Sequence, residues 1–167
     1  MRAFGVSNHT PCQIGLLKTA VEQPILINQV QLSITHSALV AQGMTSNMTT
    51  TGDAITRDGG GLVDYARIND ITLQAWSPLQ KGSEPGIFLG SPDYPELNDE
   101  IERLAEKYSV EPIAIACAWI TRHPANMQVV LGTTTPSRIV DAAAGSDISL
   151  SRAEWYSLIQ AAGHKLP

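Results

Sequence analysis

Short apolar runs rich in β-branched residues alternate along this chain with amphipathic stretches. The runs cover residues 3–7, 27–32, 71–76 and 128–131. Runs of this length that are bounded by polar turn residues are typical of strands, and apolar residues recur at helical spacing between them. Because strand and helix patterns alternate, we predict an α/β protein with a parallel sheet covered by helices.

Three helix starts can be read from local chemistry. Residues 10–13 combine a threonine N-cap, a proline at the first helical position and a glutamine that can reach back to the cap. Residues 135–136 repeat the threonine and proline directly after the fourth apolar run. Ser151 and Glu154 form a second capping box, which starts a final helix outside the strand–helix alternation.

The connections after the second and third apolar runs are longer than the others. After the third run, apolar spacing predicts two successive helices over residues 97–108 and 113–120. Residues 33–61 break the rhythm with Thr, Gly, Ser and Asn clusters, although a short helix over residues 37–42 fits the pattern. Loops of this length are usually functional or disordered, so we interpret this one as a long surface loop that contributes to specificity.

The composition is that of one ordinary acidic domain spanning residues 1–167. Its 43% hydrophobic content is enough for a core, and its formal charge of −5 without a basic stripe argues against a nucleic-acid partner. Since the chain has neither a signal-like segment nor a run of roughly 20 apolar residues, we expect no membrane partner and a cytoplasmic protein. Cys12 and Cys117 lack the spacing of a metal site, and we expect no metal.

Polar and aromatic residues cluster where the apolar runs stop. Ser7 and Asn8 close the first run, Gln29 lies in the second, and Trp76 ends the third. The carboxyl ends of parallel strands meet at one edge of a sheet, where ligands bind. Side-chain amides complement a carboxamide, and an indole can stack on a planar ring. Taken singly, each residue is more simply explained by turn formation or core packing, but together they fit a nicotinamide.

The end of the fourth run has the features of a phosphate site. Thr133 and Thr134 precede a helix whose first N–H groups are free to bind an anion, and Arg138 on its first turn could pair with a phosphate. The glycine pattern of a Rossmann nucleotide site, GxGxxG after a strand, is missing from the sequence.

Four segments carry a family resemblance. In order, they are residues 5–8 (GVSN), 28–30 (NQV), 74–79 (QAWSPL) and 132–138 (GTTTPSR). They resemble the C-terminal half of the aldo-keto reductases. The resemblance implies half of a (β/α)8 TIM barrel, in which this chain supplies the fifth to eighth strands, their helices and a C-terminal extra helix.

The resemblance also implies a set of cofactor-binding residues, namely Ser7, Asn8, Gln29, Trp76, Ser77, Leu79, Thr133, Thr134 and Arg138. The first three would hold the nicotinamide carboxamide, and the indole would stack on the nicotinamide ring. The serine and leucine that follow it would line the pyrophosphate path, and the last three residues would approach the adenosine phosphate. This favours NADP(H) over NAD(H), although many family members have a lysine where this chain has Gly132.

The resemblance places no catalytic residue in this chain. Family members carry their catalytic tyrosine, lysine, aspartate and histidine on the first four strands, so whether this chain alone is an enzyme stays open. Our leading hypothesis is the NAD(P)H-binding half of an oxidoreductase that reduces aldehydes or ketones once the missing half, or a second copy, completes the barrel. The alternatives are a non-catalytic nucleotide-binding or assembly remnant, and a structural domain whose strand-end residues only pack.

Overall fold

The computed structural model describes residues 1–45, 61–82 and 84–164 of the chain. Within these residues the strands form one parallel sheet, whose members in spatial order are β1 (Phe4–Ser7), β2 (Ile25–Gln31), β3 (Thr72–Trp76) and β4 (Gln128–Val129). Sequence order and spatial order are the same, as in one half of a (β/α)8 barrel. The predicted fold class is therefore confirmed.

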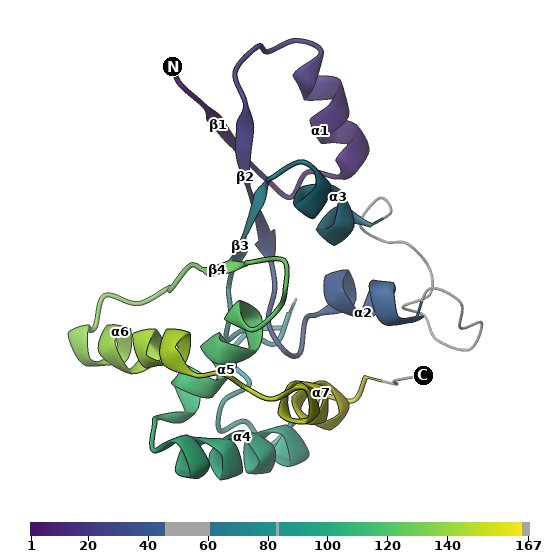
Figure 1. Cartoon of the computed structure of the whole chain (residues 1–167). Coiled ribbons are helices and arrows are strands. Elements are labelled where there is room, and N and C mark those ends of the chain that lie inside the picture. The colour runs from purple at the N-terminus through teal and green to yellow at the C-terminus, as the bar shows by residue number, and fades with distance from the viewer. Residues whose placement is uncertain (46–60, 83, 165–167) are drawn as a thin grey trace.

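The helices follow the strands in the predicted alternation, and they are α1 (Pro11–Lys18), α2 (Ala38–Thr45), α3 (Leu62–Ile68), α4 (Pro95–Tyr108), α5 (Pro112–Thr121), α6 (Pro136–Ala143) and α7 (Arg152–Ala161), with a 3-10 turn η2 (Ala144–Asp147) after α6. Figure 1 shows α1 and α3 beside one end of the sheet and α4, α5 and α7 gathered at the other. In the part of the chain that the structure describes, no helix is both long enough and apolar enough to cross a bilayer.

Both predicted capping boxes are present. Gln13 N donates to Thr10 Oγ1 at 3.3 Å, and Thr10 N donates to Gln13 Oε1 at 2.9 Å. The same reciprocal pair joins Ser151 and Glu154 at the start of α7. Thr135 takes the N-cap position of α6 before its proline, but its hydroxyl makes no cap hydrogen bond.

The fourth strand is shorter than the apolar run that predicted it. The apolar run over residues 128–131 forms a strand only at Gln128–Val129, where it pairs with β3. The short helix expected over residues 37–42 is present as α2, and the rest of the predicted long loop, residues 46–60, lies outside the described residues.

The two faces of the sheet differ in polarity. Leu73 and Ala75 of β3 are 0% and 1% exposed, and α3 packs beside this strand while α5 packs beside β4. The alternate positions of β3, including Gln74 and Trp76, are partly exposed on the opposite face. In a complete barrel this second face would line the interior.

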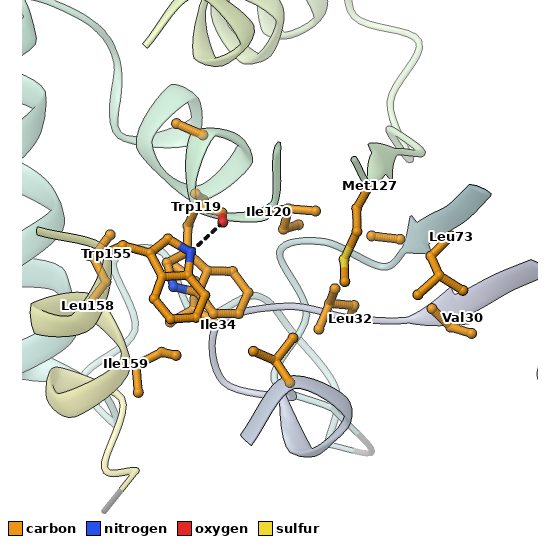
Figure 2. Packing of buried hydrophobic residues seen from close by; sticks show 14 of the residues in the cluster. Val30, Leu32, Ile34, Leu73, Trp119, Ile120, Met127, Trp155, Leu158 and Ile159 are labelled. Carbon is orange, nitrogen blue, oxygen red and sulfur yellow. Dashed lines mark hydrogen bonds between the residues drawn. The ribbon is translucent and has the colours of Figure 1, made fainter. Parts of the chain in front are cut away.

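The hydrophobic core extends from the helix-covered face of the sheet to α5 and α7. The indole rings of Trp119 and Trp155 are stacked with their centroids 5.4 Å apart. Trp155 Nε1 donates to the Trp119 carbonyl at 2.8 Å, and Figure 2 shows both rings in the core. Val30, Leu73 and Met127 continue the same core toward the sheet. The C-terminal helix is therefore built into the core.

Candidate functional site

The end of β1 is fastened to the neighbouring strand. Asn8 N donates to the Gln29 carbonyl at 2.8 Å, and Ser7 Oγ donates to the same carbonyl at 3.2 Å. Asn8 has φ of +53°, in the left-handed region that asparagine tolerates better than most residues. The chain can therefore turn sharply here, and the predicted Ser7, Asn8 and Gln29 lie next to one another.

A side-chain contact joins the ends of β1 and β3 across β2. Trp76 Nε1 donates to Asn8 Oδ1 in a long hydrogen bond of 3.4 Å between residues 68 positions apart. Because its N–H is held at the ring edge, the half-exposed indole keeps its flat faces available for stacking. The predicted asparagine and tryptophan are therefore brought together by the fold.

A row of glutamine side chains crosses the open face of the sheet just below these residues. Gln29, Gln74 and Gln128 are register partners on β2, β3 and β4. Gln29 Nε2 donates to Gln74 Oε1 at 2.9 Å, and Gln74 Nε2 donates to Gln128 Oε1 at 2.9 Å. The sequence-based site contained only the first of them. The sequence does contain a signal for Gln74 and Gln128, because each of these strands has a glutamine at the equivalent position.

Asn28 is a buried polar residue that the sequence-based site also lacks. Its side chain is 0% exposed, and it donates to the His9 carbonyl at 2.8 Å while accepting from the His9 amide at 3.4 Å. Both backbone groups of His9 are satisfied in this way. Asn28 therefore fixes the turn between β1 and α1 that carries Asn8.

The loop after β3 contains the predicted Ser77 and Leu79. Ser77 has φ of +53°, and its carbonyl accepts from Gln80 N at 3.1 Å, so the chain reverses immediately after Trp76. Leu79 packs against the core, and its carbonyl accepts from Phe88 N at 3.0 Å. The loop therefore folds back against the core at the carboxyl end of β3.

The predicted phosphate end lies between β4 and α6. Thr133 Oγ1 accepts from Thr135 N at 3.2 Å, while Thr134 is exposed. Arg138 is exposed on the first turn of α6 and belongs to none of the ion pairs between described residues. The first-turn N–H groups and one guanidinium therefore face solvent together.

His36 lies in the loop after β2. Its backbone amide donates to Ser33 Oγ at 3.0 Å, and Ser33 Oγ donates to the Gln80 carbonyl at 2.8 Å. Burial lowers the pKa of His36, so the ring is neutral near pH 7. These contacts tie the loop after β2 to the loop after β3.

The described residues hold no cluster of three His, Cys, Asp or Glu that could bind a metal ion. Cys12 and Cys117 are both free thiols, and burial raises the pKa of Cys117 to about 11. The reactive thiolate form of Cys117 is therefore scarce at neutral pH.

A cavity of about 620 Å³ lies away from the strand ends, between α2 and α3 on one side and α5 and α7 on the other. Arg67, Arg122, His123 and Trp155 are among its lining residues, and the predicted cofactor residues are not. The strand-end residues instead lie on an open surface, where Ser7, Asn8 and Arg138 are exposed.

Comparison with known proteins places the chain in a family. The family model described as "Aldo/keto reductase family" matches residues 1–162. A 6-dehydroglucose reductase of Agrobacterium fabrum is 30% identical over 95% of this chain and 46% of its own length. The oxidoreductase YdhF of Escherichia coli is 27% identical over 100% of this chain and 49% of its own length. The chain spans about half the length of the curated relatives it matches.

Solved structures share the fold. A thermostable aldo-keto reductase, Tm1743, crystallised with the inhibitor epalrestat, superposes with a TM-score of 0.67 at 21% identity, over 96% of this chain and 48% of its own. An aldo-keto reductase of the silkworm Bombyx mori, AKR2E5 complexed with NADPH, gives a TM-score of 0.61 at 20% identity, over 93% of this chain and 41% of its own. At these identities the likeness concerns the fold alone.

Proposed function

Because the chain belongs to the aldo/keto reductase family, we propose that it is the nicotinamide dinucleotide-binding half of a carbonyl reductase. One observation carries the proposal: hydrogen bonds join four residues near the carboxyl ends of the parallel strands, namely Ser7, Asn8, Gln29 and Trp76. Packing alone does not explain why amide groups and a partly exposed indole ring gather at the same strand ends.

The chemistry of these residues fits a nicotinamide. Ser7, Asn8 and Gln29 offer a hydroxyl and two amides to a ligand carboxamide, which has both a donor and an acceptor end. Trp76 offers a ring face already held at its edge by Asn8. When bound, the dinucleotide would supply the hydride for reduction of an aldehyde or ketone.

The remaining predicted residues suit the rest of the dinucleotide. Ser77 and Leu79 lie on the folded loop after β3, along the proposed pyrophosphate path. Thr133, Thr134 and Arg138 surround the start of α6, where N–H groups and a guanidinium favour an anion. These groups would bind the additional adenosine phosphate that distinguishes NADP(H) from NAD(H), so we propose NADP(H) as the preferred cofactor.

We place the reduction itself in the complete barrel. The family's catalytic tyrosine, lysine, aspartate and histidine belong to the first four strands, and this chain supplies the fold of the last four. The parallel sheet ends at β1 and β4, so a second half-barrel, either the N-terminal half or another copy, would have to pair with both edges. A non-catalytic nucleotide-binding or assembly remnant is the alternative.

Tryptophan fluorescence of the folded chain during titration with NADPH and NADH tests the proposal. Trp119 and Trp155 are buried in the core, so ligand-dependent quenching should come from Trp76 and disappear in Trp76→Phe. We expect micromolar binding with preference for NADPH, and at least tenfold weaker binding in Trp76→Ala, measured by calorimetry. A folded chain that binds neither nucleotide would contradict the proposal.

A further inference from the structure

We propose that Gln74 and Gln128 are positioning residues that fix the side-chain amide of Gln29, so that its oxygen, and not its NH2 group, is presented to the bound dinucleotide. This inference rests on the proposed function, because it concerns how the same site recognises the nicotinamide carboxamide. It adds two residues to the site, neither of which would touch the ligand.

The row is continuous and has one direction. Gln29, Gln74 and Gln128 lie in register on three adjacent strands, and each of the first two donates its amide N–H to the next oxygen at 2.9 Å. The NH2 group of Gln29 is therefore directed toward β3, where one of its two N–H groups donates to Gln74. Its carboxamide oxygen is the acceptor end of the row, on the strand that pairs with Ser7 of β1.

The row couples the orientation of Gln29 to that of Gln74 and Gln128, so Gln29 cannot rotate alone without losing its hydrogen bond. A side-chain amide has a donor end and an acceptor end, and rotation by about 180° exchanges them. If Gln29 alone rotated, its oxygen would face the oxygen of Gln74, and a hydrogen bond would become a repulsive contact. Only a joint rotation of all three amides restores the bonds, so Gln29 keeps one orientation as long as Gln74 accepts from it.

A fixed oxygen suits the carboxamide of a nicotinamide. The ligand NH2 group needs an acceptor, and an acceptor that is already oriented costs less to order on binding than a freely rotating one. The adenosine end of the dinucleotide lies elsewhere, between β4 and α6, and gains nothing from the row. The row should therefore affect the affinity for nucleotides that contain nicotinamide and leave the affinity for the adenosine fragment unchanged.

The test compares four variants with two probes, NADPH and 2′,5′-ADP, by calorimetry. Gln74→Met removes both hydrogen bonds at similar side-chain length. In Gln74→Glu the introduced carboxylate still accepts from Gln29, so the Gln29 amide keeps its orientation. The exposed Gln128 amide can rotate and donate to the same carboxylate. Gln128→Met shortens the row at its exposed end, so it keeps the test usable if Gln74→Met fails to fold. Gln160→Met, on the exposed face of α7, is the matched control for loss of an amide.

We expect Gln74→Met to weaken NADPH binding about fivefold to tenfold, the effect of losing one oriented hydrogen bond. Gln128→Met should weaken it by a smaller factor in the same direction. Gln74→Glu and Gln160→Met should bind NADPH within about twofold of the parent chain. All four variants should bind 2′,5′-ADP like the parent.

Each other outcome contradicts a specific part of the account. If the parent chain binds neither probe, the proposed function fails and this inference fails with it. If the parent binds both and Gln74→Met weakens both equally, or neither, the row is structural only and the proposed function stands. If Gln74→Glu binds NADPH as weakly as Gln74→Met, amide orientation is not the cause.

Discussion

Single side chains at the strand ends are held in place by contacts with distant segments. Asn8 meets both the backbone of Gln29 and the indole of Trp76, and its left-handed φ lets the chain turn away into α1. Gly132 shows the opposite situation, since a Cβ placed there would meet no atom within 4 Å. The proposed phosphate end is therefore open to a larger side chain, whereas the side chains of the proposed nicotinamide end already hydrogen-bond to one another.

Gly132→Lys should increase the preference for NADPH. A lysine fits the open position sterically and would add a charge-assisted contact beside Arg138, so we expect about tenfold tighter NADPH binding and little change for NADH. Isothermal calorimetry at low and high salt measures this. Gly15→Lys on α1 adds the same charge away from the strand ends and is the control. Equal gains for both nucleotides would show that the added charge does not meet the adenosine phosphate.

At the scale of elements, the local starts of helices were predictable and the long-range contacts were not. The capping boxes at Thr10 and Ser151 depend on residues three positions apart, so the sequence contains all of their determinants. The glutamine row depends on residues 45 and 54 positions apart, and the sheet register that aligns them is set by the whole fold. The length of β4 likewise could not be read from its apolar run, because only Gln128 and Val129 pair with β3.

Glu154 connects α7 to α4 and makes the stability of the fold depend on pH. Burial opposes its ionisation, but donors from Lys107, the Ser151 amide and hydroxyl, and Tyr108 outweigh this and lower its pKa to about 2. The folded pKa is below the unfolded value, so the stabilisation is complete above about pH 5 and is lost as the pH falls toward 2.

We therefore expect Glu154→Gln to lower the free energy of unfolding by about 1 kcal/mol at pH 7, a modest value because Lys107 is half exposed. The difference from the parent chain should shrink as the pH falls from 5 toward 2. Urea unfolding at several pH values measures it, with Glu106→Gln on the exposed side of α4 as the control. A difference that stays constant with pH would mean that the carboxylate charge is not the source.

Gly145 sets the close approach of η2 to α5. A Cβ at this position would lie 2.4 Å from the Ala114 carbonyl oxygen, which is backbone and cannot move aside cheaply. Gly145→Ala should lower the free energy of unfolding by about 2 kcal/mol through overpacking. Gly15→Ala inside α1, where a Cβ meets nothing within 4 Å, should raise it by up to about 1 kcal/mol. If Gly145→Ala raised the thermal stability as Gly15→Ala is expected to do, backbone propensity and not packing would dominate at Gly145.

At the scale of the whole molecule, the described part of the chain has the architecture of half a closed barrel. Both edge strands, β1 and β4, have one neighbour each, and the polar face with the glutamine row is open. On α6, which follows β4 in the chain and packs against α5, Ile139 and Val140 are 41% and 69% exposed. Unpaired sheet edges and exposed apolar side chains on α6 indicate surface that another half-barrel would cover.

This surface predicts self-association when the chain is studied alone. Val140→Glu should shift sedimentation toward the monomer, because a charge would be buried against the partner. Ile68→Glu on α3 replaces an even more exposed apolar residue, 80% exposed, away from both edges, and should leave association unchanged. A parent chain that sediments as a stable, well-folded monomer would rule out a partner-dependent half-barrel.

An NMR titration of the nitrogen-15-labelled chain with NADPH tests the central claim, that the strand ends form a nicotinamide dinucleotide site, most directly. The three indole N–H signals serve as internal reporters, since Trp76 lies at the strand ends and Trp119 and Trp155 lie in the core. The account predicts that the Trp76 indole and the amides of Asn8, Gln29 and Thr133 shift with one common affinity, while the two core indoles stay in place. Shifts confined to Trp155 and the cavity between α3 and α7, or no shifts in a folded chain, would contradict it.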